Sequence, residues 1–159
     1  MHRAAALRRT QFKLGATSGE SDEKPMVLFV SAHDAGRSRM AQAWLHRLAG
    51  DRYRARSAGI EPADRPHPEV AAAMKEVGLD IGNSPGTSLT AEEVDDASIV
   101  IGIGGAAAHA RPSFEGARED WDLDDPKGRG PEDVAAIRDL VEIRVRNLVG
   151  RLDREASGA

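Results

Sequence analysis

The stretch VLFVSAHDAGRSRMAQAWL, residues 27–45, decides the fold. With Met26 it begins with five apolar residues, a run typical of a strand that is buried on both faces of a sheet. From Arg37 to Gly50, apolar residues fall at helical spacing, and they are Met40, Ala41, Trp44, Leu45 and Leu48. Gly50 is a typical end for such a helix. We therefore expect a buried strand, a short loop that contains Gly36, and a helix.

The rest of the chain alternates between strand and helix patterns. Strands are expected over residues 53–59 and 98–105 and around Trp121, and helices over residues 67–77 and 131–152. The last helix has an apolar stripe of Val134, Ile137, Val141, Val145 and Leu148. Strands that alternate with helices predict an α/β fold with a parallel sheet and crossover helices.

The composition excludes several classes of function. The chain has 159 residues, enough for one domain with a single core, and its formal net charge of -4 argues against a broad nucleic-acid-binding face. No apolar run approaches the roughly 18 residues that span a membrane, so no membrane partner is expected. The chain contains no cysteine, which excludes disulfides, thiolate metal sites and thiol catalysis. The oligomeric state is left open by the sequence.

Residues 1–25 are expected to form a disordered or weakly helical extension, because a basic stretch is followed by a polar, acidic one. Arg8 and Arg9 form a twin arginine, but no apolar segment follows them, so we do not expect an export signal. Residues 26–159 are expected to form one domain, and the cytoplasm is the expected location.

The loop that precedes Arg37 has the features of an oxyanion-binding site. A short loop between a strand and a helix turns successive backbone N–H groups toward one point, where the helix N-terminus adds partial positive charge. Arg37 can add a bidentate guanidinium, and Gly36 permits a close backbone approach. Ligands of open α/β folds bind at the carboxyl ends of strands. A small anionic or phosphorylated ligand is therefore favoured over an ordinary turn with a solvated arginine.

Four further stretches carry a resemblance to a known family: RSAGIEP (56–62), HPEVAAAMKEVGLDI (67–81), SLTAEEVDDASIVIGIG (88–104) and EDWDLDDPKGRGPEDVAAIRDLVE (119–142). With residues 27–45 they resemble the low-molecular-weight protein tyrosine phosphatases, and more closely their arsenate-reductase branch of the thioredoxin- or mycothiol-coupled type. The resemblance implies an open four-stranded parallel sheet with helices on both faces, as in flavodoxin-like folds. It also implies an oxyanion pocket beneath the Asp125–Pro126 segment, in which the anion is bound by Ala32, Ala35, Gly36, Arg37 and Ser38.

The sequence departs from the family pattern at three places. Ser31 stands where the family has a cysteine that attacks phosphorus or arsenic as a thiolate, and a serine hydroxyl would need a general base. Asp34 stands where the family usually has asparagine. Its carboxylate would repel an oxyanion by about 1–4 kcal/mol, unless it pairs with Arg37 or His33. Residues 102–112 lack the resolving cysteines of thioredoxin-coupled arsenate reductases. The thiolate route to arsenate reduction or phosphotyrosine hydrolysis is therefore excluded.

Further residues are candidates for the site. The resemblance implies that Asp125 protonates the leaving oxygen, while His33 and Asp34 are candidate acid–base groups beside Ser31 at the nucleophile position. A loop-shaping role is favoured for His33. The pocket rim is assigned to His109, Arg111 and Trp121. Packing beneath the covering loop is favoured for the tryptophan, and His67 is expected to start a helix. No metal-binding motif is recognisable, and no cofactor is expected.

Three hypotheses follow from these residues. The favoured one is a divergent, cysteine-free family member that keeps a phosphate-like ligand but has lost the ancestral chemistry, as a pseudoenzyme or regulatory binding protein. The second is a repurposed enzyme that uses Asp34, His33 and Asp125 as acid–base groups on a small, for example phosphorylated, metabolite. The third is an inactive cysteine-to-serine variant of a working enzyme, which by itself would not explain Asp34 or the cysteine-free residues 102–112.

Overall fold

The computed structural model describes residues 24–105 and 117–158. Its elements follow the predicted alternation: β1 (Met26–Ser31), α2 (Arg37–Ala49), β2 (Arg54–Gly59), α3 (Pro68–Glu76), α4 (Ala91–Asp96), β3 (Ile99–Ile103), β4 (Ala117–Trp121) and α5 (Pro131–Ala156). The predictions made for residues 1–23 and for His109 and Arg111 lie outside the described residues.

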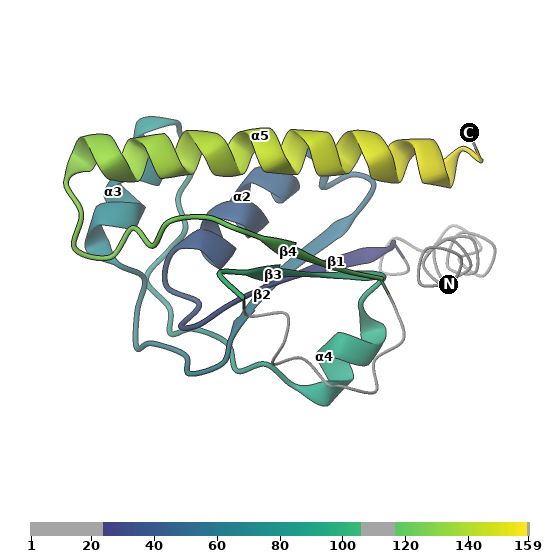
Figure 1. The fold of residues 1–159 in the computed structure, drawn as a ribbon, viewed down its shortest axis with the longest axis horizontal. Coiled ribbons are helices and arrows are strands. Elements are labelled where there is room, and N and C mark those ends of the chain that lie inside the picture. Colours follow the sequence, from purple (N-terminus) through teal and green to yellow (C-terminus); the bar gives the residue numbers. More distant parts are fainter. Residues whose placement is uncertain (1–23, 106–116, 159) are drawn as a thin grey trace.

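The four strands form one parallel sheet in the order β2-β1-β3-β4. Strand β1 lies in the interior of the sheet, where Phe29 pairs with Ser57 of β2 and with Ile101 of β3. Because the strands are parallel, their carboxyl ends meet at one edge, on the left in Figure 1, and the loop after β1 lies at this edge. The predicted open four-stranded parallel sheet is confirmed.

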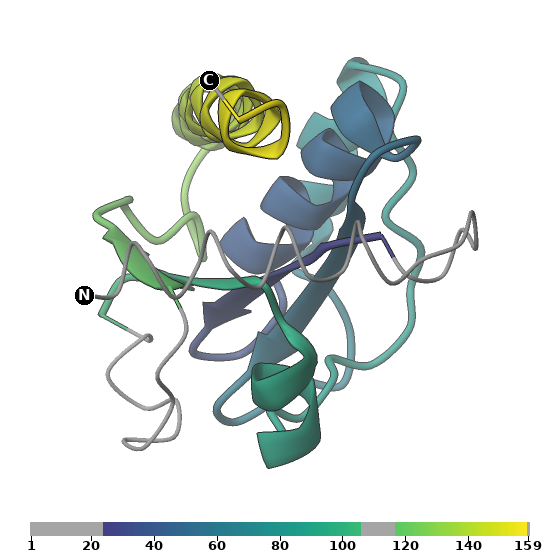
Figure 2. The same ribbon diagram turned by 90° about the vertical axis from the view of Figure 1, so that its right-hand side faces the viewer.

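Helices cover both faces of this sheet (Figures 1 and 2). Helices α2, α3 and α5 lie on one face, and α4 lies on the other. The larger core lies beneath the three helices and includes Val27, Phe29, Met40, Trp44, Met74, Ile101, Val141 and Leu148. The smaller core, beneath α4, includes Met26, Leu28, Val30, Val94 and Val100. Strand β1 contributes alternate side chains to the two cores, which explains why its sequence is apolar without interruption.

Helix α4 is the element that differs from the sequence expectation, which places no helix there. Val94 is its one buried residue, so the segment has no apolar period to reveal it. The hydroxyl of Thr90 accepts a hydrogen bond from the backbone N–H of Glu93 at 3.1 Å. A threonine followed three residues later by a glutamate is the sequence signal of a capping box, and this signal could have indicated the helix.

Helix α5 follows the predicted apolar stripe and continues to Ala156, beyond the expected end at residue 152. Its buried apolar residues are Val134, Ile137, Val141, Val145, Leu148 and Leu152. Neither this helix nor any other in the described ranges is both long enough and apolar enough to cross a membrane.

Candidate functional site

The loop between β1 and α2 turns its backbone carbonyls away from its concave side. These carbonyls accept hydrogen bonds from the segment of residues 60–67: Ser31 from Ile60 (3.1 Å), Ala32 from Glu61 (2.8 Å), His33 from Ala63 (2.9 Å) and Ala35 from His67 (2.9 Å). In a trans peptide the N–H group points opposite to the carbonyl. The N–H groups of Ala32, His33 and Gly36, which follow three of these carbonyls, therefore point to the concave side, as an oxyanion requires, while the N–H of Asp34 donates to Ser31 Oγ.

Gly59, the last residue of β2, lies directly against this loop. A Cβ atom at Gly59 would be 2.8 Å from both the carbonyl carbon of His33 and the backbone nitrogen of Asp34. No side chain fits in that space, so the close approach of β2 to the loop requires glycine at this position.

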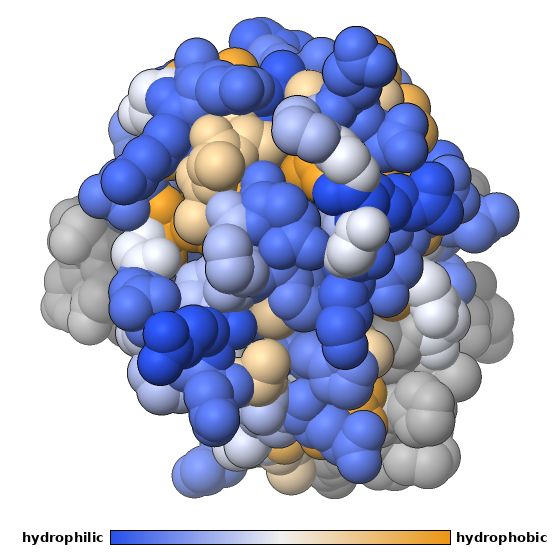
Figure 3. All heavy atoms as spheres, turned by 90° about the vertical axis from the view of Figure 1, so that its left-hand side faces the viewer, coloured by the Kyte–Doolittle hydropathy of each residue, from blue (hydrophilic) through white to orange (hydrophobic). Residues whose placement is uncertain are grey.

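The concave side of the loop forms a small hollow at the carboxyl edge of the sheet. The hollow is lined by Ser31, Ala32, His33, Ala35, Gly36, Arg37, His67 and Asp125. It lies at the largely hydrophilic end of the molecule that Figure 3 shows, and its volume of about 10 Å³ admits one water-sized group. Ala32, His33 and Asp125 are exposed around this hollow, so its rim is open to solvent.

Arg37 is the first residue of α2 and lies half-buried beside the hollow. Its Nη1 donates a hydrogen bond to the carbonyl of Leu123 at 2.6 Å. Gly104, after β3, has a φ of +67° and leaves room for this guanidinium, since a Cβ there would lie 2.8 Å from Nη1. A guanidinium has five N–H donors, so the bond to Leu123 leaves others for an oxyanion.

Asp125 reaches the hollow from the segment that connects β4 to α5. Its Oδ1 accepts a hydrogen bond from the backbone N–H of Lys127 at 3.0 Å. The same segment is anchored to α3, because Glu69 Oε2 accepts the N–H of Gly128 at 2.7 Å. Hydrogen bonds from the backbone N–H groups of Glu69 itself and of Gly128 lower the pKa of the Glu69 carboxyl. This anchor keeps the segment that carries Asp125 beside the loop.

The side chain of Asp34 faces away from the hollow. Its φ of 50° is the one positive value among non-glycine residues in the described part of the chain, a conformation that aspartate and asparagine tolerate. The buried carboxylate accepts hydrogen bonds from Ser38 Oγ (2.7 Å) and from the N–H of Thr87 (2.9 Å). The alternative in which Asp34 pairs with Arg37 or His33 is wrong, because the backbone turn at residue 34 directs the carboxylate to Ser38 and Thr87 on the opposite side of the loop.

Ser31, at the nucleophile position, lies buried at the base of the hollow. Its Oγ is 2.7 Å from Ser38 Oγ and accepts the N–H of Asp34 at 3.2 Å. The structure therefore brings Ser31, Arg37 and Asp125 together around one hollow, and it places the Asp34 carboxylate behind Ser38.

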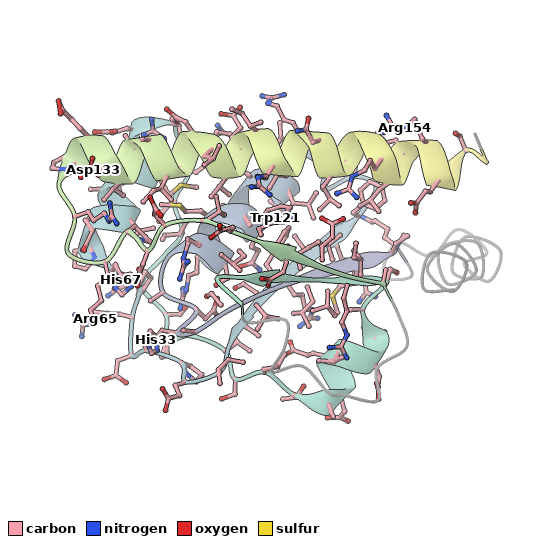
Figure 4. All side chains as sticks on the ribbon, viewed as in Figure 1. His33, Arg65, His67, Trp121, Asp133 and Arg154 are labelled. Carbon is pink, nitrogen blue, oxygen red and sulfur yellow. The ribbon has the colours of Figure 1, made fainter. Side chains whose placement is uncertain are left out.

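Two histidines lie at this end of the molecule, as Figure 4 shows. His33 Nδ1 is 2.9 Å from the carbonyl oxygen of Glu61, in keeping with a loop-shaping residue. His67 precedes α3 as expected, but it also lines the hollow, which the sequence did not indicate. Burial lowers the pKa of His67, while the nearby carboxylates of Glu69 and Asp125 oppose this shift. The position of His67 depends on the hydrogen bond from its backbone N–H to the carbonyl of Ala35. No local sequence pattern indicates this contact.

Trp121 does not lie at the rim of the hollow. It ends β4 with 3% of its surface exposed, and its ring centroid is 5.7 Å from that of Phe29. Its Nε1 donates to Glu119 at 3.0 Å, and Figure 4 shows it beneath α5, away from His33. Trp121 is therefore a packing residue, as the favoured interpretation expected, and not a rim residue, because a side chain of β4 that faces α5 belongs to the core.

Comparison with known proteins places this site in a family. Residues 26–157 match the family described as low molecular weight phosphotyrosine protein phosphatase. The chain belongs to this family. The glutaredoxin arsenate reductase of Synechocystis sp. is 32% identical to it over 128 residues, which cover 79% of this chain and 97% of that protein.

Solved structures of the phosphatase family agree with the fold. An arsenate reductase in a phosphate-binding state has 31% identity and a TM-score of 0.70, over 80% of this chain and 98% of that one. A cysteine-to-serine variant of the YwlE arginine phosphatase, with a phosphorylated active-site serine, has the same fold: its TM-score is 0.72 at 22% identity, over 81% of this chain and 96% of that one. The protein is thus a cysteine-free, divergent member of this family, which includes an arsenate reductase solved in a phosphate-binding state.

A larger cavity lies on the reverse side of the phosphatase-family loop. It has a volume of about 430 Å³, and its lining includes Asp34, Arg39, Gln42, His46, Arg56 and Glu93. Arg39 is buried in its wall, where Nε donates to the carbonyl of Asp34 (2.6 Å) and Nη2 to that of Ser84 (2.7 Å). Burial raises the pKa of Glu93, with Arg56 opposing and Asp34 reinforcing the shift. The loop therefore separates a small, donor-lined hollow from a larger cavity of mixed charge.

Proposed function

We propose that this protein binds a phosphate-sized oxyanion in the loop of residues 31–38 and does not catalyse arsenate reduction or phosphotyrosine hydrolysis by the thiolate route. The observation that carries the proposal is the outward turn of the loop carbonyls, which leaves the backbone N–H groups facing a hollow that Arg37 also lines. The similarity to an arsenate reductase in a phosphate-binding state supports phosphate as the probe ligand. The chain has no thiol with which to attack it.

Each part of the loop has a role in this proposal. The N–H groups around the hollow donate to the oxyanion, and Arg37 supplies a charge-assisted bond to a further oxygen. Asp125, at the rim, would face the leaving oxygen of a phosphorylated ligand. A serine in this type of loop is compatible with a bound phosphoryl group, since the YwlE variant carries one on its active-site serine.

The orientation of Asp34 argues against the second hypothesis, in which Asp34, His33 and Asp125 act together on a metabolite. The Asp34 carboxylate is buried behind Ser38 and is bonded to Ser38 and Thr87. It therefore does not contact a ligand in the hollow, and the hydrogen bond that connects it to the hollow runs through Ser38.

The test is a titration of the full-length protein with inorganic phosphate, followed by amide NMR spectra and calorimetry. We expect the amide signals of residues 32–38 to shift with saturation, and chloride at equal ionic strength to leave them in place. Arsenate reduction with a thiol reductant and sustained hydrolysis of aryl phosphates are expected to be absent. Saturating phosphate without any shift in the loop, or sustained turnover by the purified protein, would contradict the proposal.

A further inference from the structure

We propose that Ser31 accepts a phosphoryl group and that its proton passes through Ser38 to Asp34. This inference rests on the proposed function, because a phosphorylated ligand must first bind in the loop. It is carried by two consecutive short contacts: Ser31 Oγ to Ser38 Oγ at 2.7 Å, and Ser38 Oγ to Asp34 Oδ1 at 2.7 Å. All three residues are buried, and Ser38 and Asp34 lie behind Ser31, outside the lining of the hollow.

The direction of the bonds follows from the number of hydroxyl protons. An ionised carboxylate only accepts hydrogen bonds, so Ser38 donates its single proton to Asp34. The contact between the two serines must then be a bond from the Ser31 hydroxyl to Ser38. The N–H of Asp34 donates to Ser31 Oγ at 3.2 Å and stabilises the negative charge that develops on this oxygen. Because Ser31 lines the hollow, its oxygen is accessible to a phosphorus atom bound there.

Asparagine at position 34 would reverse this direction. The N–H of Thr87 donates to the Asp34 side chain at 2.9 Å, so the oxygen of an asparagine would face Thr87 and its NH₂ group would face Ser38. Ser38 would then donate toward residue 31, which suits a thiolate but not a hydroxyl that must lose its proton. The serine at 31 and the aspartate at 34 are therefore two coupled departures from the family pattern.

The proposed step transfers a phosphoryl group from a phosphomonoester with a good leaving group. Ser31 Oγ forms a bond to phosphorus while the bond from phosphorus to the leaving oxygen breaks, and its electron pair departs with that oxygen. The Ser31 proton moves to Ser38 as the Ser38 proton moves to Asp34. With p-nitrophenyl phosphate, the products are phosphoserine, protonated Asp34 and the phenolate. A serine alkoxide is a poor leaving group, so the phosphoserine accumulates instead of turning over.

The experiment incubates the full-length protein with p-nitrophenyl phosphate and locates the product by intact-mass and peptide-mapping mass spectrometry. We expect a burst of one p-nitrophenolate and one phosphoryl group per chain, on Ser31. Asp34→Asn and Ser38→Ala should slow the burst on the order of 100-fold, as loss of a general base does, and Ser31→Ala should remove it. Ser98→Ala is the matched control, since the buried Ser98 hydroxyl has no partner among the described residues and precedes β3 at the opposite edge of the sheet.

A parallel titration with inorganic phosphate separates proton transfer from a structural role of Asp34. We expect Asp34→Asn to bind phosphate more tightly, because a negative charge is removed, and yet to be phosphorylated more slowly. If the aspartate only stabilised the loop, the variant would lose phosphate affinity as well as phosphorylation rate. If the wild type binds phosphate but forms no phosphoserine, this inference is overturned and the proposed function stands. If the wild type neither binds phosphate nor forms phosphoserine, the inference and the proposed function are both overturned. Equal burst rates of the wild type and Asp34→Asn would also overturn the relay.

A gain of activity provides a test that misfolding cannot imitate. The variant Ser31→Cys/Asp34→Asn should hydrolyse p-nitrophenyl phosphate with turnover, about tenfold faster than Ser31→Cys alone, because the aspartate charge disfavours a neighbouring thiolate. Equal rates of the two variants would show that residues 31 and 34 are not coupled and would overturn the inference.

Discussion

The two sides of the loop of residues 31–38 differ in size and in chemistry. The concave side is a hollow of about 10 Å³ toward which backbone N–H groups point, whereas the reverse side faces a cavity of about 430 Å³ with charged side chains of both signs. The smaller site is the one with convergent donors, and for this reason we propose it, and not the larger cavity, as the ligand site. In this proposal the backbone binds the ligand, and side chains on the reverse side fix the shape and charge of the loop.

Two arginines of α2 make this difference concrete. Arg37 lines the hollow and is half-buried, while Arg39 is buried in the reverse cavity and bonds to the carbonyls of Asp34 and Ser84. We therefore expect substitution of Arg37 to act mainly on ligand binding, and substitution of Arg39 to act mainly on the stability of the loop.

The largest expected effect is that of Arg39→Ala on stability. The substitution leaves two carbonyls without their charged donor and opens a space in the wall of the cavity, so the free energy of unfolding should fall by about 3 kcal/mol. Urea denaturation measures this. The matched control is Arg47→Ala, because Arg47 also donates to two backbone carbonyls but is exposed, and its loss should cost less than about 1 kcal/mol. Equal losses for the two variants would remove the distinction between them.

The next effect is that of Arg37→Ala on phosphate affinity. Loss of a charge-assisted hydrogen bond costs about 1.5–3 kcal/mol, so we expect affinity to fall by roughly 10- to 100-fold. The variant also loses the bond to the carbonyl of Leu123, so its free energy of unfolding should fall by about 1–2 kcal/mol, less than in Arg39→Ala. Isothermal titration calorimetry measures the change. Arg65→Ala is the control, since Arg65 is exposed at the same end of the molecule (Figure 4) and does not line the hollow. A similar loss in both variants would indicate general electrostatic attraction instead of a specific contact.

A smaller effect is expected where the Asp125 segment is anchored. Glu69→Gln keeps an acceptor but removes the charge, so the amide of Gly128 should exchange faster with solvent while the amides of β1 stay protected. Because the pKa of Glu69 is lowered in the folded state, its contribution is present at neutral pH and is lost as the pH falls through that lowered value. Hydrogen exchange read by NMR checks both statements. Unchanged exchange at Gly128 would contradict the anchor.

The smallest effect concerns His67. A doubly charged anion in the hollow favours the protonated imidazole, so sulfate should raise the pKa of His67, and sulfate should bind a few-fold more tightly as the pH falls. The imidazole NMR signals, titrated with and without sulfate, measure the shift. Sulfate is the suitable probe because it stays doubly charged over this range. A pKa that sulfate leaves unchanged would place the anion away from His67.

The same histidine predicts a pH dependence of stability. Burial lowers its pKa in the folded state below the ordinary value of 6.5, so the unfolded chain takes up its proton first as the pH falls. The folded protein should therefore lose stability as the pH drops from 6.5 toward the lowered pKa. His67→Gln should remove that part of the slope in urea unfolding measured across this range, while the rest of the profile stays.

The sequence predicted most of the fold because its core elements have strong periods. The apolar run of β1 and the stripe of α5 follow directly from burial on two faces and on one face. The sequence did not predict helix α4, because its six residues bury only one side chain and so show no apolar period. The Thr90–Glu93 capping box was the signal that could have indicated it. At the site, the sequence indicated Arg37 and the loop. The orientation of Asp34 depends on Thr87, which is 53 residues away, and no local pattern encodes it.

Because it has no side chain, Gly59 lets strand β2 pack directly against the loop, so the shape of the loop depends on this strand. A methyl group added there would press on the peptide between His33 and Asp34 and would displace the carboxylate that Ser38 contacts. Gly59→Ala, a substitution in β2, would thus change the shape of the loop and weaken anion binding, although residue 59 itself does not contact the anion. The geometry of the hollow therefore depends on the lack of a side chain at residue 59.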